Sequence, residues 1–117
     1  MTSKEFILKS LPALVESFPM IKCRYEYRSY SDMHLIEVSP DNILDDVRFS
    51  EESEKLVDSF LLEFPLESIA FLSSSSLATV SSPIETWIGA TYMDIAALAV
   101  IDMKKSAINR RSKLNIS

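Results

Sequence analysis

The stretch that decides the fold is Lys22-Cys-Arg-Tyr-Glu-Tyr-Arg-Ser29 followed by Met33-His-Leu-Ile-Glu-Val-Ser39. In the first half, Cys23, Tyr25 and Tyr27 alternate one by one with charged residues, a period of two that is typical of a strand with one buried face. In the second half, one face holds His34, Ile36 and Val38, and the other holds Met33, Leu35, Glu37 and Ser39. Turn-forming residues join the halves. The sequence therefore predicts an antiparallel hairpin over residues 22–39.

The apolar faces of these strands also predict the register of the hairpin. They match only if paired residue numbers have an odd sum, because a slip of one residue turns every side chain over. A sum of 61 sets Arg24 opposite Glu37, a favourable charge pair. A sum of 63 sets Glu26 against Glu37, and 59 leaves a two-residue turn without Gly or Asn. We therefore expect the pairs Cys23–Val38, Tyr25–Ile36 and Tyr27–His34.

A helix is predicted before the hairpin. Thr2 with Glu5 three positions later is the pattern of a capping box, and apolar residues follow at helical spacing up to Pro19. Pro12 leaves two alternatives, a kinked helix or a short one that begins near Leu11, because proline costs about 3 kcal/mol inside a helix. The predicted buried stripe is Ile7, Leu11, Leu14, Val15 and Phe18.

A second helix is predicted after the hairpin. Pro40 ends the strand, and Ser50 followed by a run of glutamates is typical of a helix start, where acids interact favourably with the helix dipole. Pro65 ends this helix, because the residue before a proline avoids helical angles. The predicted buried stripe is Leu56, Val57, Phe60, Leu61 and Phe64.

Two further segments complete the expected sheet. Residues 69–72, Ile-Ala-Phe-Leu, form a short apolar run that predicts a central strand covered on both faces. Four serines at 73–76 predict a turn. Residues 77–80 predict a strand that returns beside the strand at 69–72, so that a second hairpin spans 69–80.

A last helix is predicted after Thr91, which would cap it, running to about Arg110. Its middle is apolar nearly all round, so we expect it to be buried or to pair with its copy in a homo-oligomer through residues 92–103. From Lys104 onward the chain is basic, and we expect a flexible tail there.

Together these elements predict one α+β domain over residues 1–117. The length of 117 residues leaves no room for a second core, and 47% hydrophobic residues suffice for one. We expect a mainly antiparallel sheet of about four strands in two hairpins, with two or three helices on one face.

Composition and charge exclude several classes of protein. A single cysteine forbids an intrachain disulfide, and no apolar run approaches the roughly 20 residues of a membrane span, so we expect a cytoplasmic protein. The only glycine, Gly89, cannot build a P-loop or a dinucleotide fingerprint, and we expect no cofactor. The net charge of −5 opposes binding of nucleic acid.

His34 is the only histidine, so a general base or a metal site would have to include it. We expect it at the end of the hairpin, bonded to Tyr27 or to backbone, in a polar site near Glu37. In the predicted register it lies roughly 13 Å from Cys23, too far for a nucleophilic pair. One histidine and one cysteine also make a zinc site untenable. We therefore assign no catalytic or metal-binding residue.

The acidic middle of the chain is the best indication of function. Residues 31–69 carry eleven acids and two bases. Such a segregated charge favours encounter with a basic protein partner. The candidate partner-binding residues are Asp45, Asp46, Glu51, Glu52 and Glu54.

Three short motifs within residues 25–80 resemble a pattern shared by small bacterial proteins to which no activity is assigned. They are His34-Leu-Ile-Glu-Val-Ser-Pro40, Glu63-Phe-Pro65 and Ile69-Ala-Phe-Leu-Ser73 continuing to Leu77. All three are structural, so the resemblance implies no catalytic residue. The leading hypothesis is a non-enzymatic protein-binding module, such as an accessory, immunity or antitoxin-like protein. The alternatives are a small enzyme centred on His34 and a homo-oligomeric structural protein.

Overall fold

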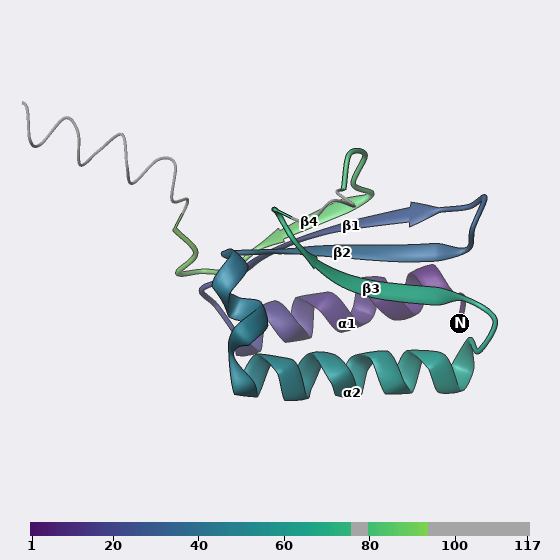
Figure 1. Ribbon diagram of the computed structural model, residues 1–117, viewed down its shortest axis with the longest axis horizontal. Coiled ribbons are helices and arrows are strands. Elements are labelled where there is room, and N and C mark those ends of the chain that lie inside the picture. The colour runs from purple at the N-terminus through teal and green to yellow at the C-terminus, as the bar shows by residue number, and fades with distance from the viewer. Residues whose placement is uncertain (76–79, 94–117) are drawn as a thin grey trace, which may run out of the picture.

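The computed structural model describes residues 1–75 and 80–93 and shows an α+β fold of two layers. A four-stranded sheet carries helices α1 (Ser3–Ser17) and α2 (Val47–Glu63) on one of its faces, here called the inner face (Figure 1). A 3-10 helix, η1 (Asp41–Asp45), leads into α2. The predicted α+β class is confirmed, with two α-helices in the described residues.

The sheet is mixed rather than purely antiparallel. Its strands are β1 (Lys22–Arg28), β2 (Met33–Ser39), β3 (Ser68–Ser73) and β4 (Glu85–Ile88), in the order β3-β2-β1-β4. β1 is antiparallel to both β2 and β4, whereas β2 and β3 are parallel. The parallel pair arises because α2 crosses back between β2 and β3, as in a βαβ unit.

The first hairpin is confirmed in detail. Cys23 pairs with Val38, Tyr25 with Ile36 and Tyr27 with His34, and Arg24 lies opposite Glu37. The chain turns over residues 29–32, where Asp32 has a positive φ of 47° that Asp tolerates better than most residues.

Helix α1 resolves the two alternatives at Pro12. Thr2 and Glu5 form the predicted capping box, and the helix continues through Pro12 to Ser17. Pro12 itself is exposed, so its ring does not disturb the buried side. The predicted stripe is confirmed, because all five of its residues are buried: Ile7, Leu11, Leu14, Val15 and Phe18.

Helix α2 begins earlier than predicted. The cap is Asp46, whose side chain accepts a hydrogen bond from the N–H of Phe49, and not Ser50. Phe49 is fully buried, so the first turn has to form around it. The predicted end is confirmed, since the helix stops at Glu63 and Phe64 is its C-cap.

The second hairpin of the sequence prediction is replaced by a different arrangement. The apolar run at 69–72 does form a strand, but β3 lies at an edge of the sheet rather than in its centre. The expected return strand falls almost wholly on residues 76–79, outside the described residues. The expected last helix and the self-pairing segment begin at residue 92, and residues 92–93 are not helical. The rest of both, and the basic tail, fall on 94–117, outside the described residues. A fourth strand, β4, was not predicted.

β4 is short, and Gly89 follows it directly. A Cβ atom at Gly89 would lie 2.1 Å from the carbonyl oxygen of Pro19, so no side chain fits there. The N–H of Gly89 donates to the carbonyl of Ile21, which ties the end of β4 to the segment that precedes β1. The single glycine of the chain therefore serves a close approach of backbone to backbone.

The core lies between the helices and the inner face. Phe18 packs edge-on against Phe49, with ring centroids 5.3 Å apart, and Phe6 packs in the same way on Phe60. The strands contribute buried side chains on alternate residues: Cys23, Tyr25, Ile36 and Val38.

Candidate functional site

The only histidine is the centre of a buried polar network on the inner face. His34 is 0% exposed, its Nδ1 lies 2.6 Å from the hydroxyl oxygen of Tyr25, and its Nε2 lies 2.7 Å from Oε1 of Glu67. A carboxylate accepts hydrogen bonds, so Nε2 donates to Glu67, and Nδ1 shares a hydrogen bond with the hydroxyl of Tyr25. Both ring nitrogens of His34 are thus satisfied.

The expected partner of His34, Tyr27, contacts its ring rather than its nitrogens. The two residues pair across the hairpin as predicted, with ring centroids 4.7 Å apart. The hydroxyl of Tyr27 instead donates to Asp32, which holds the pKa of Tyr27 above its ordinary value. The diagonal neighbour Tyr25 is the residue that reaches Nδ1. The prediction of a bond to Tyr27 was therefore wrong.

The geometry of this network favours a structural role. Burial, with the nearby Glu67 carboxylate as a second cause, raises the pKa of Tyr25. Phe60 covers the histidine ring edge-on at 5.1 Å, and only the Glu67 side chain, 23% exposed, reaches solvent. A substrate would have to displace the core to touch His34. The burial of His34 therefore argues against the small-enzyme hypothesis.

Cys23 lies on the same face, four residues along β2 from His34 through its partner Val38. It is 0% exposed, and burial raises the pKa of its thiol to about 12. A thiol in that state is neither a nucleophile nor a metal ligand at neutral pH. Among the described residues, no group of three His, Cys, Asp or Glu side chains is placed to hold a metal ion.

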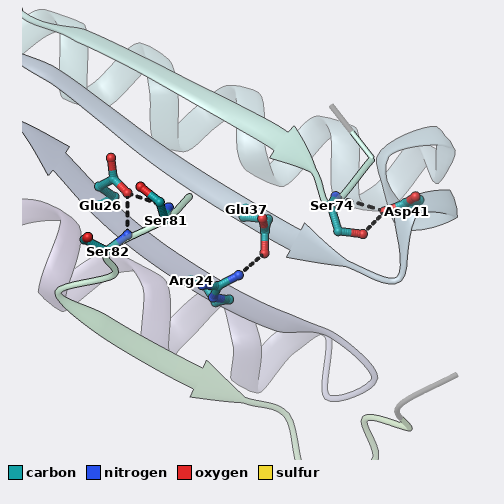
Figure 2. A network of polar contacts seen from close by, with 7 residues as sticks. All are labelled: Arg24, Glu26, Glu37, Asp41, Ser74, Ser81 and Ser82. Carbon is teal, nitrogen blue, oxygen red and sulfur yellow. Dashed lines mark hydrogen bonds and ion pairs between the residues drawn. The ribbon is translucent and has the colours of Figure 1, made fainter. Parts of the chain in front are cut away.

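The opposite, outer face of the sheet buries carboxylates (Figure 2). Glu37 is 5% exposed and forms an ion pair with Arg24 at 2.9 Å, directly across the hairpin. This is the charge pair predicted from the register. Glu37 therefore lies on the face away from His34 and does not share a site with it.

Glu26 holds a second segment of chain against the outer face. Its Oε1 accepts the N–H groups of Ser81 and Ser82 at 2.8 and 2.9 Å (Figure 2). Its Oε2 accepts a hydrogen bond from Nε of Arg28 at 2.6 Å. Burial by itself raises the pKa of Glu26, but these hydrogen bonds outweigh it and hold the pKa below its ordinary value. Glu26 is thus an anchor for the chain that leads into β4.

A further anchor holds the other end of this connection, where the chain leaves β3. The N–H and hydroxyl of Ser74 both donate to Oδ1 of Asp41, at 3.0 and 2.7 Å (Figure 2). Side-chain hydrogen bonds from Ser74 and Ser75 hold the pKa of Asp41 below its ordinary value. β3 and β4 are at opposite edges of the sheet, so the two anchors secure the start and the end of a crossing connection.

The candidate partner-binding acids fall into different roles. Glu51 and Glu54 are exposed on the solvent side of α2. Glu52 is also exposed, but it pairs with Lys55 at 3.1 Å. Asp45 is exposed at the end of η1, whereas Asp46 is the helix cap. Asp58, which sequence reasoning did not single out, lies one turn after Glu54 and is exposed.

An open groove of about 320 Å³ runs between the two helices. Its walls combine small polar residues with the apolar side chains of Phe6, Leu14 and Leu56. It also holds one ion pair, between Glu52 and Lys55. The lining residues from α1 include Ser10, Ala13 and Ser17, and those from α2 include Leu56 and Ser59. No cluster of catalytic side chains is among them.

The comparisons with known proteins assign no family. No family model, curated protein or solved structure matches this chain. The resemblance to small bacterial proteins thus stays a prediction. In the part of the chain that the structure describes, no helix is long and apolar enough to cross a membrane.

Sequence reasoning missed the residues that satisfy the buried polar groups. Glu67, Ser81 and Ser82 lie 33, 55 and 56 positions from their partners. A signal was present at Glu26, an acid on a strand whose cross-strand neighbour Leu35 is apolar. Such an acid needs a donor once it is covered. The donor itself could not be identified without the topology.

Proposed function

We propose that this protein is a non-enzymatic binding module that recognises another protein through the solvent-facing side of α2. The observation that carries the proposal is a ridge of exposed side chains along α2. It consists of the acids Glu51, Glu54 and Asp58, followed by two leucines at the C-terminal end of the helix. Leu62 is 86% exposed and Leu66, just past the helix, is 95% exposed. Acids beside exposed apolar side chains suit a partner that offers both basic and apolar groups.

The burial of the two side chains that could carry out catalysis also supports this proposal. His34 and Cys23 are both fully buried, and both ring nitrogens of His34 are engaged. By contrast, the acids of the ridge are exposed to solvent. Lys55 is the only basic residue between positions 49 and 103, so the negative potential on this side is hardly compensated.

Charge reversal on the ridge tests the proposal. We expect the double variant Glu51→Lys/Glu54→Lys to lose partners that the native chain retains after cross-linking and native purification, while its circular dichroism stays unchanged. Asp46 is excluded from the set, because its replacement would remove the cap of α2. The matched control is Glu16→Lys/Glu85→Lys, which reverses two exposed acids on α1 and β4. Equal capture by the ridge variant and the control would contradict the proposal.

A further inference from the structure

β3 presents an unpaired edge in the part of the chain that the structure describes. It is the terminal strand in the order β3-β2-β1-β4 and runs along the front of the sheet, above α2 (Figure 1). The N–H of Ser68 donates to the carbonyl of Asp32, towards β2. Because backbone groups alternate along a strand, Ile69 and Phe71 direct their N–H and C=O groups to the open side.

This edge lacks the features that usually protect an exposed strand. Residues 68–73 contain no charged residue and no proline, and β3 is six residues long. Ile69 and Phe71 pack on the core with their side chains, which holds the backbone of the edge in place. A firmly held, unprotected edge is a template for a further strand.

α2 provides an apolar floor beside the edge. Lys55 and Ser59 line the groove towards α1, and Phe60 is buried beneath the sheet. At about 100° per residue, the side of α2 that points away from α1 then carries Val57 and Leu61. Leu61 is 39% exposed. A strand added to β3 would place alternate side chains over these two residues.

The charged side chains around the β3 edge indicate which kind of segment would bind there. Acids bracket it: Glu54 on α2, Glu67 before β3, and Asp41 beyond its end. A second copy of the chain would bring an equally acidic flank against this one, which is unfavourable. An extended segment that alternates apolar and basic residues would instead cover the floor with one set of side chains and meet the acids with the other.

We propose that β3 binds an extended, basic and apolar segment of a partner protein as a fifth strand of the sheet. The inference rests on the proposed function and names the way in which the partner docks. Its main-chain bonds involve Ile69 and Phe71, and its apolar side chains contact Leu61.

A synthetic peptide of alternating lysine and valine residues, eight long and blocked at both ends, tests this mode of binding. We expect it to slow the hydrogen exchange of the Ile69 and Phe71 amides, measured by NMR. A peptide of the same sequence with N-methyl groups on alternate residues keeps the charge but cannot form the ladder. We expect it to bind at least about tenfold more weakly. Equal binding of the two peptides, or no protection at Ile69 and Phe71, would overturn the proposal.

Two leucine variants locate the site independently. We expect Leu61→Lys to weaken peptide binding about tenfold, because it places a cation where an apolar side chain should rest. The matched control, Ile88→Lys, adds the same charge at an exposed apolar residue of β4, at the opposite edge of the sheet, and should bind as the native chain does. If Leu62→Lys on the ridge loses binding and Leu61→Lys does not, the ridge binds proteins and β3 does not, so the proposed function stands and strand addition fails. A concentration-dependent dimer that protects the same amides would also overturn the proposal, in favour of a second copy.

Discussion

The two faces of the β1–β2 hairpin bury their polar groups by different means. On the inner face, Tyr25 and His34 are hydrogen-bonded to each other within an aromatic core. On the outer face, Glu26 and Glu37 are carboxylates held by arginines and backbone N–H groups. Burial of charge is tolerated only where such donors are present. We therefore expect the inner face to contribute to stability through packing, and the contribution of the outer face to change with pH.

The largest effect concerns the thiol of Cys23. With its pKa raised to about 12 from an ordinary 9.0, the thiolate fraction at pH 8 is about a thousandfold lower than in the unfolded chain. We expect alkylation of Cys23 to be slower in the native protein by at least that factor, since burial also blocks the reagent. Mass spectrometry after timed quenching measures the rate.

The control for this experiment moves the thiol to the outer face. The variant Cys23→Ala/Thr86→Cys carries its thiol on an exposed residue of β4, opposite Arg24. It should react at close to the rate of the unfolded chain. Rapid labelling of native Cys23 would show that the inner face opens readily and would remove the contrast between the faces.

A smaller effect is expected from breaking the histidine network. His34→Phe keeps a ring of similar shape but leaves the Tyr25 hydroxyl buried without a partner, which costs about 1–3 kcal/mol. Tyr25→Phe leaves Nδ1 of His34 unsatisfied at a similar cost. The double variant removes both groups, so its loss in the free energy of unfolding should be well below the sum. Urea denaturation of all four chains gives the coupling. Additive losses would show that the 2.6 Å contact contributes nothing.

How far the sequence predicts this fold depends on how many residues separate the segments that pair with each other. The first hairpin and its register follow from residues less than 20 positions apart, where turn length and cross-strand charge leave one alignment. The position of β3 does not follow, because a short apolar run such as 69–72 looks the same at an edge and in the centre. The parallel pairing with β2 depends on the path of α2, which no local pattern specifies.

The candidate sites show the same limit. The sequence correctly predicts that Cys23 is a core residue and that Glu37 pairs with Arg24, since both follow from the hairpin alone. It assigns His34 the wrong partner, because Glu67 directly precedes β3, whose place in the sheet was unknown. The start of α2 was misplaced for a different reason: Ser50 and Asp46 are both good caps, and burial of Phe49 decides between them.

The smallest expected effect belongs to the outer face, at Glu26. In Glu26→Gln, the amide oxygen still accepts from Ser81 and Ser82, but the amide nitrogen, itself a donor, faces Nε of Arg28. Bonds to a charged group are roughly twice as strong as neutral ones. We expect a loss of about 1–2 kcal/mol at pH 7, measured by urea denaturation.

The pH dependence of this loss separates the outer face from the inner one. The folded pKa of Glu26 lies below its ordinary 4.5, so its contribution is complete above pH 4.5 and is lost as the pH falls through the folded pKa. The difference in the free energy of unfolding between the native chain and Glu26→Gln should therefore shrink as the pH is lowered below 4.5. Glu16→Gln, at an exposed residue of α1, is the matched control and should show no such gap. A gap that stays constant down to pH 3 would mean that the geometry of the amide, and not the charge on Glu26, holds the connection to β4.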